Sequence, residues 1–204
     1  MPYCVGVTGG IGSGKSRAAS LFGELGALVV DTDDISHEIT GAGGSAMPAI
    51  TATFGAAAAA ADGSLDRAAM RQRVFQNPDV RKQLESVLHP LIRETARNRV
   101  AQSTAPYVLL VVPLLLETGG YRDLIRRVLV VDCDESLQIS RTMQRSNLTE
   151  EAVRAIMAAQ LPRPQRLAGA DDVINNSGDI SQLRDQVVQL HQDYLSRAAD
   201  GGHK

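Results

Sequence analysis

Residues 9–16 of this chain read Gly-Gly-Ile-Gly-Ser-Gly-Lys-Ser, which is a complete phosphate-binding loop. The glycines allow backbone N–H groups to turn inward around phosphates, at backbone angles that a Cβ atom would oppose. Lys15 can reach the β- and γ-phosphates, and the Ser16 hydroxyl can complete the coordination of Mg²⁺. The motif therefore predicts that the chain binds a nucleoside triphosphate together with its magnesium ion.

The sequence on both sides of this loop supports the interpretation. Residues 3–8 form a short apolar run typical of a buried strand, and residues 17–25 continue with the apolar spacing of a helix. A helix that begins at the loop directs its N–H groups and the positive end of its dipole at the anion. Strand, loop and helix in this order disfavour the alternative, a glycine-rich turn that precedes Lys-Ser by chance.

Further apolar segments alternate with helical patterns along the chain. The predicted strands are residues 28–31, 106–112, 127–132 and 172–175, and a last helix is predicted over residues 180–197. Continuously apolar strands separated by helices are typical of a parallel sheet that is buried on both faces. We therefore expect an α/β fold of the P-loop NTPase type, with an open, five-stranded parallel sheet and helices on both faces.

The chain length of 204 residues fits a single domain, residues 1–204, that carries inserted segments. The predicted core comprises residues 1–35, 105–135 and 167–198. Residues 36–104 are too long for a simple crossover, so we interpret them as a helical insert that binds the acceptor substrate. Residues 136–166 are expected to form an arginine-bearing lid.

The insert has a helical pattern with interruptions. A helix start is predicted at residues 64–67, and the alanine run of residues 56–61 fits either a packed helix or a loose loop. Apolar residues at helical spacing predict a further helix that ends before Pro90. These residues are Val80, Leu84, Val87 and Leu88.

Composition argues against several other classes of protein. The formal net charge is −2 and no basic tail is present, so neither nucleic acid nor a membrane is expected as a partner. No N-terminal signal and no membrane-spanning segment are expected, because the apolar runs are too short. Cys4 and Cys133 lie in predicted buried strands, which favours reduced core residues over a disulfide or a metal pair. We expect a cytoplasmic protein that is a monomer or a weak homo-oligomer and binds small molecules.

Phosphate-binding loops occur in kinases, GTPases, motors and transport ATPases, and further features separate these classes. The chain has no guanine-binding Asn-Lys-x-Asp motif, and the strand of residues 106–112 leads into Pro-Leu-Leu-Leu-Glu instead of a magnesium-holding Asp. Lid arginines neutralise charge on the transferred phosphoryl oxygens in small-molecule kinases. The candidates are Arg141, Arg145, Arg154, Arg163 and Arg166. We favour the catalytic role for Arg141 and a solvated helical face for Arg154 and Arg163.

Together these motifs resemble the dephospho-CoA kinase family over about residues 3–195. The resemblance implies that the chain transfers a phosphoryl group from ATP to the ribose 3′-hydroxyl of dephospho-coenzyme A, the last step of coenzyme A biosynthesis. The residues that carry it are 7–16, Asp31, Asp33, Leu88-His89-Pro90, 112–117, Gln160 and 173–178.

The resemblance also implies roles for individual residues. Asp33 is the catalytic base, Lys15 and Arg141 complete the catalytic set, Asp31 supports the loop and Asp34 caps the following helix. Helix capping is the alternative role for all three acids. The implied ATP-binding residues are Gly10, Ile11, Gly12, Ser13, Gly14, Lys15, Ser16 and Arg17, with Asn175 and Gly178 around the adenine.

On the acceptor side, the resemblance implies Thr8, Asp33, His89 and Glu117, and Ser16 is the implied ligand of Mg²⁺. The alternative for His89, which precedes Pro90, is a structural helix terminus. Two other functions stay open: another small-molecule kinase, acting on a nucleoside monophosphate or shikimate, and an ATP-responsive regulatory module. The long insert and the Leu-His-Pro motif disfavour the first. An acid facing the phosphates and an arginine-bearing lid disfavour the second.

Overall fold

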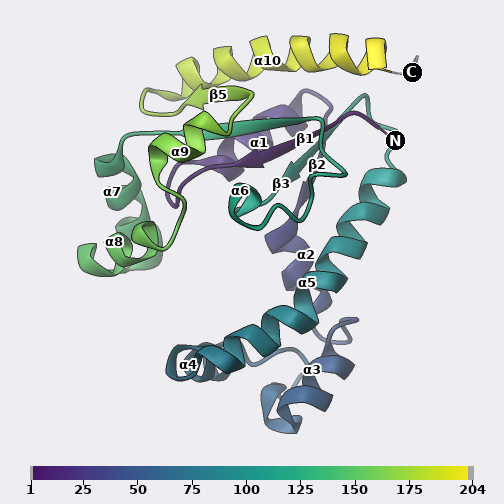
Figure 1. Ribbon diagram of the computed structural model, residues 1–204, viewed down its shortest axis with the longest axis vertical. Helices are drawn as coiled ribbons and strands as arrows, with labels where there is room; N and C mark the ends of the chain where they lie inside the picture. The colour runs from purple at the N-terminus through teal and green to yellow at the C-terminus, as the bar shows by residue number, and fades with distance from the viewer. Residues whose placement is uncertain (1, 202–204) are drawn as a thin grey trace. The chain divides into compact units, whose positions relative to one another are not determined.

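The computed structural model describes residues 2–201 and contains a five-stranded sheet with the strand order β2-β3-β1-β4-β5 (Figure 1). The ladders that join β1 to β3, β1 to β4 and β4 to β5 are parallel. The strands are β1 (Cys4–Thr8), β2 (Leu28–Asp31), β3 (Val108–Val111), β4 (Arg127–Asp132) and β5 (Asp172–Asn175). The predicted fold class is confirmed, and three of the strands have the predicted bounds.

The chain forms two compact units. One unit contains the chain up to Val30 and again from Arg99 onward, and it includes most of the sheet. The other unit, Asp31–Asn98, is helical. The first unit carries the phosphate-binding loop and the second carries the acidic cluster.

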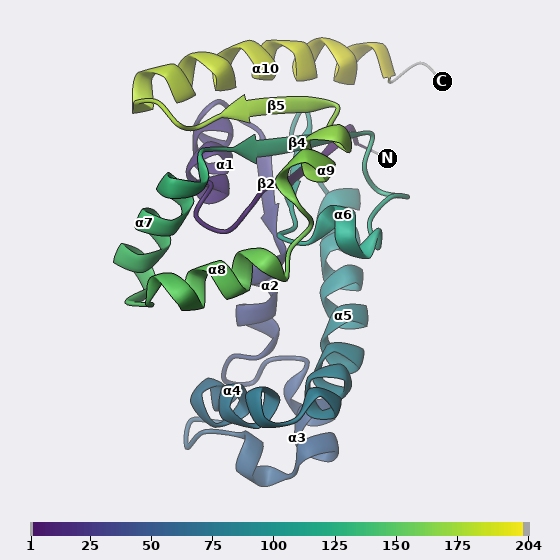
Figure 2. The same cartoon turned by 60° about the vertical axis from the view of Figure 1, so that its left-hand side comes forward.

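One face of the sheet is covered by α1 (Lys15–Glu24) and α10 (Ile180–Gly201), which pack against each other and against the strands (Figure 2). Alternate strand residues such as Val5, Leu109 and Leu129 point into this core, because successive side chains of a strand lie on opposite faces. The short helix α6 (Leu115–Thr118) packs on β1.

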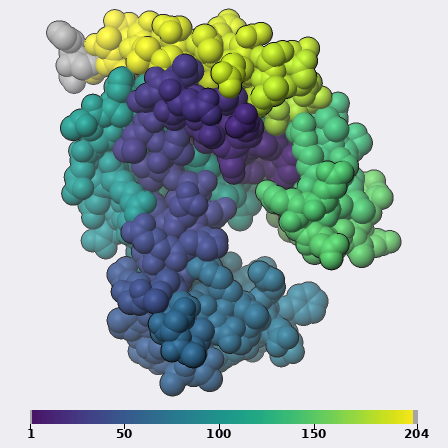
Figure 3. Space-filling view, turned by 180° about the vertical axis from the view of Figure 1, so that it is seen from behind, coloured from purple at the N-terminus to yellow at the C-terminus, as the bar shows by residue number. Residues whose placement is uncertain are grey.

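The C-terminal helix α10 is joined to the sheet by aromatic packing and by a buried polar network. In the space-filling view, the yellow C-terminal segment lies directly on the purple N-terminal segment (Figure 3). Tyr194 is fully buried and stacks on Phe22 at 6.0 Å between ring centroids. Its hydroxyl donates to Asp172 at 3.0 Å, and Arg127 donates to both oxygens of the same carboxylate. Although burial opposes the charge of Asp172, the hydrogen bonds from Arg127 and Tyr194 hold its pKa below the usual value.

His191 of α10 provides a prediction about stability and pH. Its Nδ1 is 2.8 Å from the hydroxyl of buried Tyr107, and burial lowers the pKa of His191. The unfolded chain therefore binds this proton more readily than the folded chain does. We expect His191 to stabilise the fold above about pH 6.5, the usual histidine pKa, and this contribution to be lost as the pH falls.

Denaturant unfolding between about pH 5 and pH 7.5 measures this effect, which for one group cannot exceed about 1.4 kcal/mol per pH unit. In His191→Gln the fall in unfolding free energy towards acidic pH should be shallower than in the unaltered protein. His89→Gln, at an exposed position of α5, is the control for the loss of one histidine, and its slope should differ from that of His191→Gln. Equal slopes in all three proteins would contradict the assignment.

The helical unit contains α2 (Thr32–Ile39), α3 (Met47–Phe54), a 3₁₀ turn η1 (Ala56–Ala58), α4 (Arg67–Gln76) and most of α5 (Pro78–Ala101). The helix start near residues 64–67 is confirmed, since the Asp66 side chain accepts from the N–H of Ala69. The alanine run forms neither a full helix nor a loose loop, because its first three residues make η1, Ala59 is bridged to Leu65 and the Ala60 N–H donates to Ser64.

The prediction that a helix ends before Pro90 is wrong, because α5 continues through His89 and Pro90 to Ala101. Pro90 is exposed, and the less exposed stripe of the helix continues beyond it at Leu91, Ala96 and Val100. Packing along this stripe offsets the backbone hydrogen bond that a proline removes. The alternative of a helix terminus at His89 is therefore also wrong.

Three helices form the segment between β4 and β5: α7 (Glu135–Ser146), α8 (Glu150–Ala158) and α9 (Arg163–Ala168) (Figure 2). Asn147 ends α7 in the left-handed conformation, with φ 51°. Thr149 caps α8 by accepting from the N–H of Ala152 at 3.3 Å.

Several smaller expectations also have an outcome. Cys4 and Cys133 are free and buried, and burial raises the pKa of the Cys4 thiol to about 12. Over residues 2–201, no helix combines the length and apolarity needed to span a membrane. The last helix extends beyond residue 197 to Gly201, so the predicted frayed tail of residues 201–204 begins within a helix and otherwise lies outside the described residues.

Candidate active site

The phosphate-binding loop leads directly from β1 into α1. Gly12 and Gly14 have φ angles of 72° and 92°, which are unfavourable for residues with a Cβ atom. A Cβ on Gly12 would also lie 2.4 Å from the backbone oxygen of Gln138 in α7. Both positions therefore require glycine for their conformation, and at Gly12 the close approach of α7 is a second reason.

The start of α1 has the features of an anion site. Its N-cap residue, Gly14, makes no side-chain capping bond, and the first turn has no acidic residue. The first N–H groups of a helix have no acceptor within the helix, and the helix dipole adds positive potential there. A bound phosphate would satisfy these donors, so the residues present fit a nucleotide.

The Lys15 ammonium group lies over the loop. Its Nζ donates to the backbone oxygens of Gly9 at 2.8 Å and Gly10 at 3.0 Å. Ser16 and Arg17 follow as exposed residues in the first turn of α1. Among residues 2–201, no cluster of three or more His, Cys, Asp or Glu residues could hold a metal ion. A Mg²⁺ ion held mainly by phosphates and water needs no such cluster, and the exposed Ser16 hydroxyl could supply one ligand.

A cavity of about 320 Å³ lies beside the loop, and it brings several of the predicted residues together. Its lining residues are Gly14, Arg17, Arg141, Asn176, Gly178, Asp179, Ile180 and Leu183. Arg141 donates to the backbone oxygen of Asn176 at 3.1 Å. Asn175 does not line this cavity, and its side chain instead accepts from the N–H of Ser177 in a local turn.

Asn176 is a loop-bracing residue that the sequence analysis did not identify. It is 7% exposed, and its Nδ2 donates to the backbone oxygen of Ser13 at 2.7 Å. Its own N–H donates to the backbone oxygen of Asp132, at the end of β4. The sequence marks Asn176 only by its position within residues 173–178. In that run the resemblance to the family implies adenine contacts for Asn175 and Gly178, and no role for Asn176.

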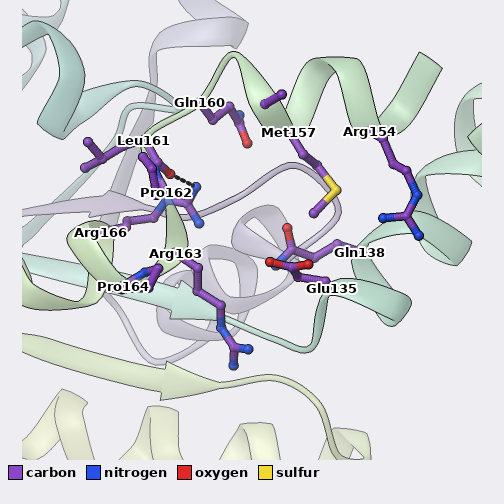
Figure 4. Close-up of a pocket in the computed structure, with 11 residues that line it drawn as sticks. Glu135, Gln138, Arg154, Met157, Gln160, Leu161, Pro162, Arg163, Pro164 and Arg166 are labelled. Atoms are coloured by element: carbon purple, nitrogen blue, oxygen red, sulfur yellow. Dashed lines mark hydrogen bonds between the residues drawn. The ribbon is translucent and has the colours of Figure 1, made fainter. Parts of the chain in front are cut away.

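A second cavity, of about 340 Å³, lies between the helices of the lid (Figure 4). Side chains from α7, α8 and α9 line it, including Gln138, Met157 and Arg166. Gln160 also lines it, and its amide oxygen accepts from the N–H of Ile11 at 3.0 Å. The lid and the loop are therefore directly connected.

The lid arginines have different environments. Arg154 forms an ion pair with Glu150 on an exposed face of α8, as predicted. The same prediction for Arg163 is wrong, because Arg163 forms a two-pronged ion pair with Asp132, which is almost fully buried. This pair ties the start of α9 to the carboxyl end of β4, and the hydrogen bond with Asp132 raises the pKa of Arg163.

The predicted acceptor-side residues lie in three places. The Thr8 hydroxyl is buried and donates to the backbone oxygen of Pro113 at 3.0 Å. Glu117 accepts from the N–H of Leu161 at 2.9 Å, which places it against the lid. His89 is exposed on α5 and Asp33 is exposed in the first turn of α2, both within the helical unit.

Asp31, and not Asp34, caps α2. The Asp31 side chain accepts from the N–H of Asp33 at 2.8 Å, and burial raises the pKa of the Asp31 carboxyl. The prediction that Asp34 is the cap is therefore wrong, since Asp34 lies in the first turn beside Asp33. The last residue of β2 is the residue positioned to cap the helix that follows it.

Comparison with known proteins gives the same assignment as the motifs. The family model described as dephospho-CoA kinase matches residues 3–182. The chain belongs to the dephospho-CoA kinase family. A dephospho-CoA kinase of Thiobacillus denitrificans is 56% identical over 198 residues, which are 97% of this chain and 98% of that protein. The dephospho-CoA kinase of Chromobacterium violaceum is also 56% identical, with 94% of each chain covered.

Solved structures support the same family. A Thermus thermophilus protein has a TM-score of 0.81 and 31% identity, with 94% of this chain and 97% of that chain covered. The dephospho-CoA kinase from Campylobacter jejuni has a TM-score of 0.70 and 27% identity, covering 96% and 98%. An Acinetobacter baumannii shikimate kinase shares only the fold, at 17% identity with a TM-score of 0.55. The predicted dephospho-CoA kinase family and kinase class are thus confirmed.

Proposed function

We propose that this chain transfers the terminal phosphoryl group of ATP to the ribose 3′-hydroxyl of dephospho-coenzyme A, which gives coenzyme A. The observation that carries this proposal is the 56% identity to a dephospho-CoA kinase over nearly the whole of both chains. The phosphate-binding loop and the lid of the structure supply the parts that phosphoryl transfer needs. The cytoplasmic location and the monomeric or weakly oligomeric state stay predictions.

The phosphates of ATP are proposed to lie on the N–H groups at the start of α1, with Lys15 and Arg141 neutralising charge. Catalysis of this reaction consists mainly of positioning and electrostatic stabilisation, because charge spreads over the phosphoryl oxygens. Arg141 lines the cavity next to Gly14, which supports its place near the nucleotide. When bound, Mg²⁺ would neutralise phosphate charge, and Ser16 would be one of its ligands.

Asp33 is proposed to orient the acceptor hydroxyl and to accept its proton. Its carboxylate is exposed and follows the carboxyl end of β2 by two residues, and ligands of parallel sheets bind beyond such ends. Thr8, His89 and Glu117 are proposed acceptor-side residues. Because Glu117 already accepts from Leu161, its part in acceptor binding would be linked to the lid.

The division of the chain into a core (1–35, 105–135, 167–198), an acceptor-binding insert (36–104) and a lid (136–166) is part of this proposal. The lid would close over the reacting groups and exclude water, since ATP would otherwise be hydrolysed.

The test compares ADP release from ATP with dephospho-coenzyme A, AMP, CMP, shikimate or no acceptor. We expect dephospho-coenzyme A to be strongly preferred and phosphorus NMR to locate the new phosphate on the 3′-oxygen. Preference for another acceptor would contradict this proposal and favour a small-molecule kinase that acts on a nucleoside monophosphate or shikimate. ATP binding without acceptor-dependent ADP release would favour the regulatory module.

A further inference from the structure

Gln160 forms a contact that none of the roles described so far explains. The residue follows α8, in the segment that joins the lid back to the core. Its Oε1 accepts from the backbone N–H of Ile11 at 3.0 Å, although the two residues are 149 positions apart in the chain. A side chain of the lid thus satisfies a backbone donor of the phosphate-binding loop.

The neighbouring residue, Leu161, is held on both sides of its backbone. Its N–H donates to Oε1 of Glu117 at 2.9 Å, and its C=O accepts from Nη2 of Arg166 at 2.6 Å. Hydrogen bonds to α6 and α9 therefore fix the backbone next to Gln160, whose side chain binds the loop.

The loop is also packed closely around this contact. Arg166 is 7% exposed, and its Nη1 lies 3.0 Å from the position that a Cβ atom on Gly10 would occupy. The carboxamide oxygen of Gln138 lies 2.5 Å from the same position. The backbone of residues 10–11 thus lies against polar side chains of the lid, and Gln160 accepts a hydrogen bond from it.

We propose that Gln160 is a positioning residue, which fixes the phosphate-binding loop at Ile11 and joins the base of the lid to that loop. The effect on catalysis rests on the proposed function, whereas the effect on the loop does not. A loop held in its binding conformation loses less conformational freedom when the phosphates bind. Because the same residue belongs to the lid, loop order and lid position are linked through one hydrogen bond.

The test uses Gln160→Met, which keeps the length of the side chain but has no acceptor oxygen of comparable strength. Hydrogen exchange at the Ile11 amide, followed by NMR in the nucleotide-free protein, reports the bond directly. Calorimetric titration with ATP reports its consequence. We expect faster exchange at Ile11, an ATP Kd raised about five-fold by the loss of one hydrogen bond, and a melting temperature lowered by at most about 4 °C.

Two further variants complete the experiment. Gln160→Glu retains an acceptor oxygen and should restore slow exchange at Ile11. Gln165→Met changes an exposed glutamine of α9 and should behave like the unaltered protein in all three measurements. If Gln160→Met does not fold, Gln160→Asn provides the same test, because its amide is one methylene short of the loop.

Wild-type exchange at Ile11 in Gln160→Met would overturn the proposal, as would faster exchange with an unchanged Kd for ATP. A lowered melting temperature with an unchanged Kd would show a purely structural role and would also overturn it. None of these measurements uses an acceptor. Failure of the proposed reaction would therefore appear separately, as the absence of turnover with dephospho-coenzyme A.

Discussion

Lys15→Ala is expected to reduce turnover of dephospho-coenzyme A by at least roughly 10²–10³-fold, the usual effect of removing a donor that stabilises the transition state. Nζ of Lys15 is held over the loop by the backbone oxygens of Gly9 and Gly10. Removing it takes away a positive charge at the loop proposed to hold the phosphates, so ATP binding should weaken as well. ADP release and calorimetric titration with ATP measure the two effects.

Lys82→Ala is the matched control for Lys15→Ala. Lys82 is an exposed residue of α5 that pairs with Asp79 at 3.7 Å and is not among the residues proposed to bind ATP or the acceptor, so the variant removes the same side chain at an unrelated position. It should retain full turnover. Lys15→Arg should also be impaired, because the rigid guanidinium group does not replace a compact ammonium in the loop. Near-normal turnover in Lys15→Ala would exclude the loop as the catalytic phosphate site.

Asp33→Asn is expected to lower turnover by about 10²–10⁴-fold, as the loss of a general base does, while ATP binding is retained. Retention follows because Asp33 is proposed to act on the acceptor hydroxyl and not on the nucleotide. The variant should therefore separate ATP binding from phosphoryl transfer. The Kd for ATP should stay close to that of the unaltered protein, whereas the rate of transfer should fall strongly.

Asp34→Asn provides a close control for Asp33→Asn. Both residues are exposed and lie in the first turn of α2, so both substitutions remove one negative charge from the same helix N-terminus. A charge at that position contributes about 0.3–1 kcal/mol to helix stability, and the two variants should lose a similar amount. Only Asp33→Asn should lose turnover. Equal turnover in the two variants would remove Asp33 from the role of base.

The parts of the fold that were predictable from the sequence are those with a strong local signal. β2, β4 and β5 have the predicted bounds because each is a short apolar run that ends at a polar residue. The loop was predictable because glycine spacing, lysine and serine specify both its conformation and its ligand. The helix start at residues 64–67 was predictable because Asp66 caps an N–H group only three residues away.

Two of the errors, at Pro90 and Arg163, arise where packing or a distant contact outweighs a local rule. Pro90 is a strong local signal for a helix end, but the stripe that runs from Leu91 to Val100 keeps α5 continuous. Arg163 has an exposed helical pattern, yet its partner Asp132 lies 31 positions earlier, at the end of β4. No periodic pattern in the sequence indicates that Arg163 pairs with Asp132.

The site shows the same division between local and distant contacts. The nucleotide residues around Gly14 and Lys15 are adjacent in the sequence, and the motif identifies them directly. Asn176 and Gln160 brace the loop from 163 and 149 positions away, so only the tertiary structure reveals what they contact. Both residues are among those that carry the resemblance to the family, but the sequence does not indicate what either residue contacts.

The packing of α10 has a consequence for how the chain is made. Leu183, Val187 and Tyr194 of this last helix belong to the same apolar core as Val5 and Val7 of β1. During synthesis, the first strand leaves the ribosome long before the helix that covers it. The part of this apolar face that α10 covers therefore stays open until α10 has been synthesised, and in this interval it is a surface for chaperones or for aggregation.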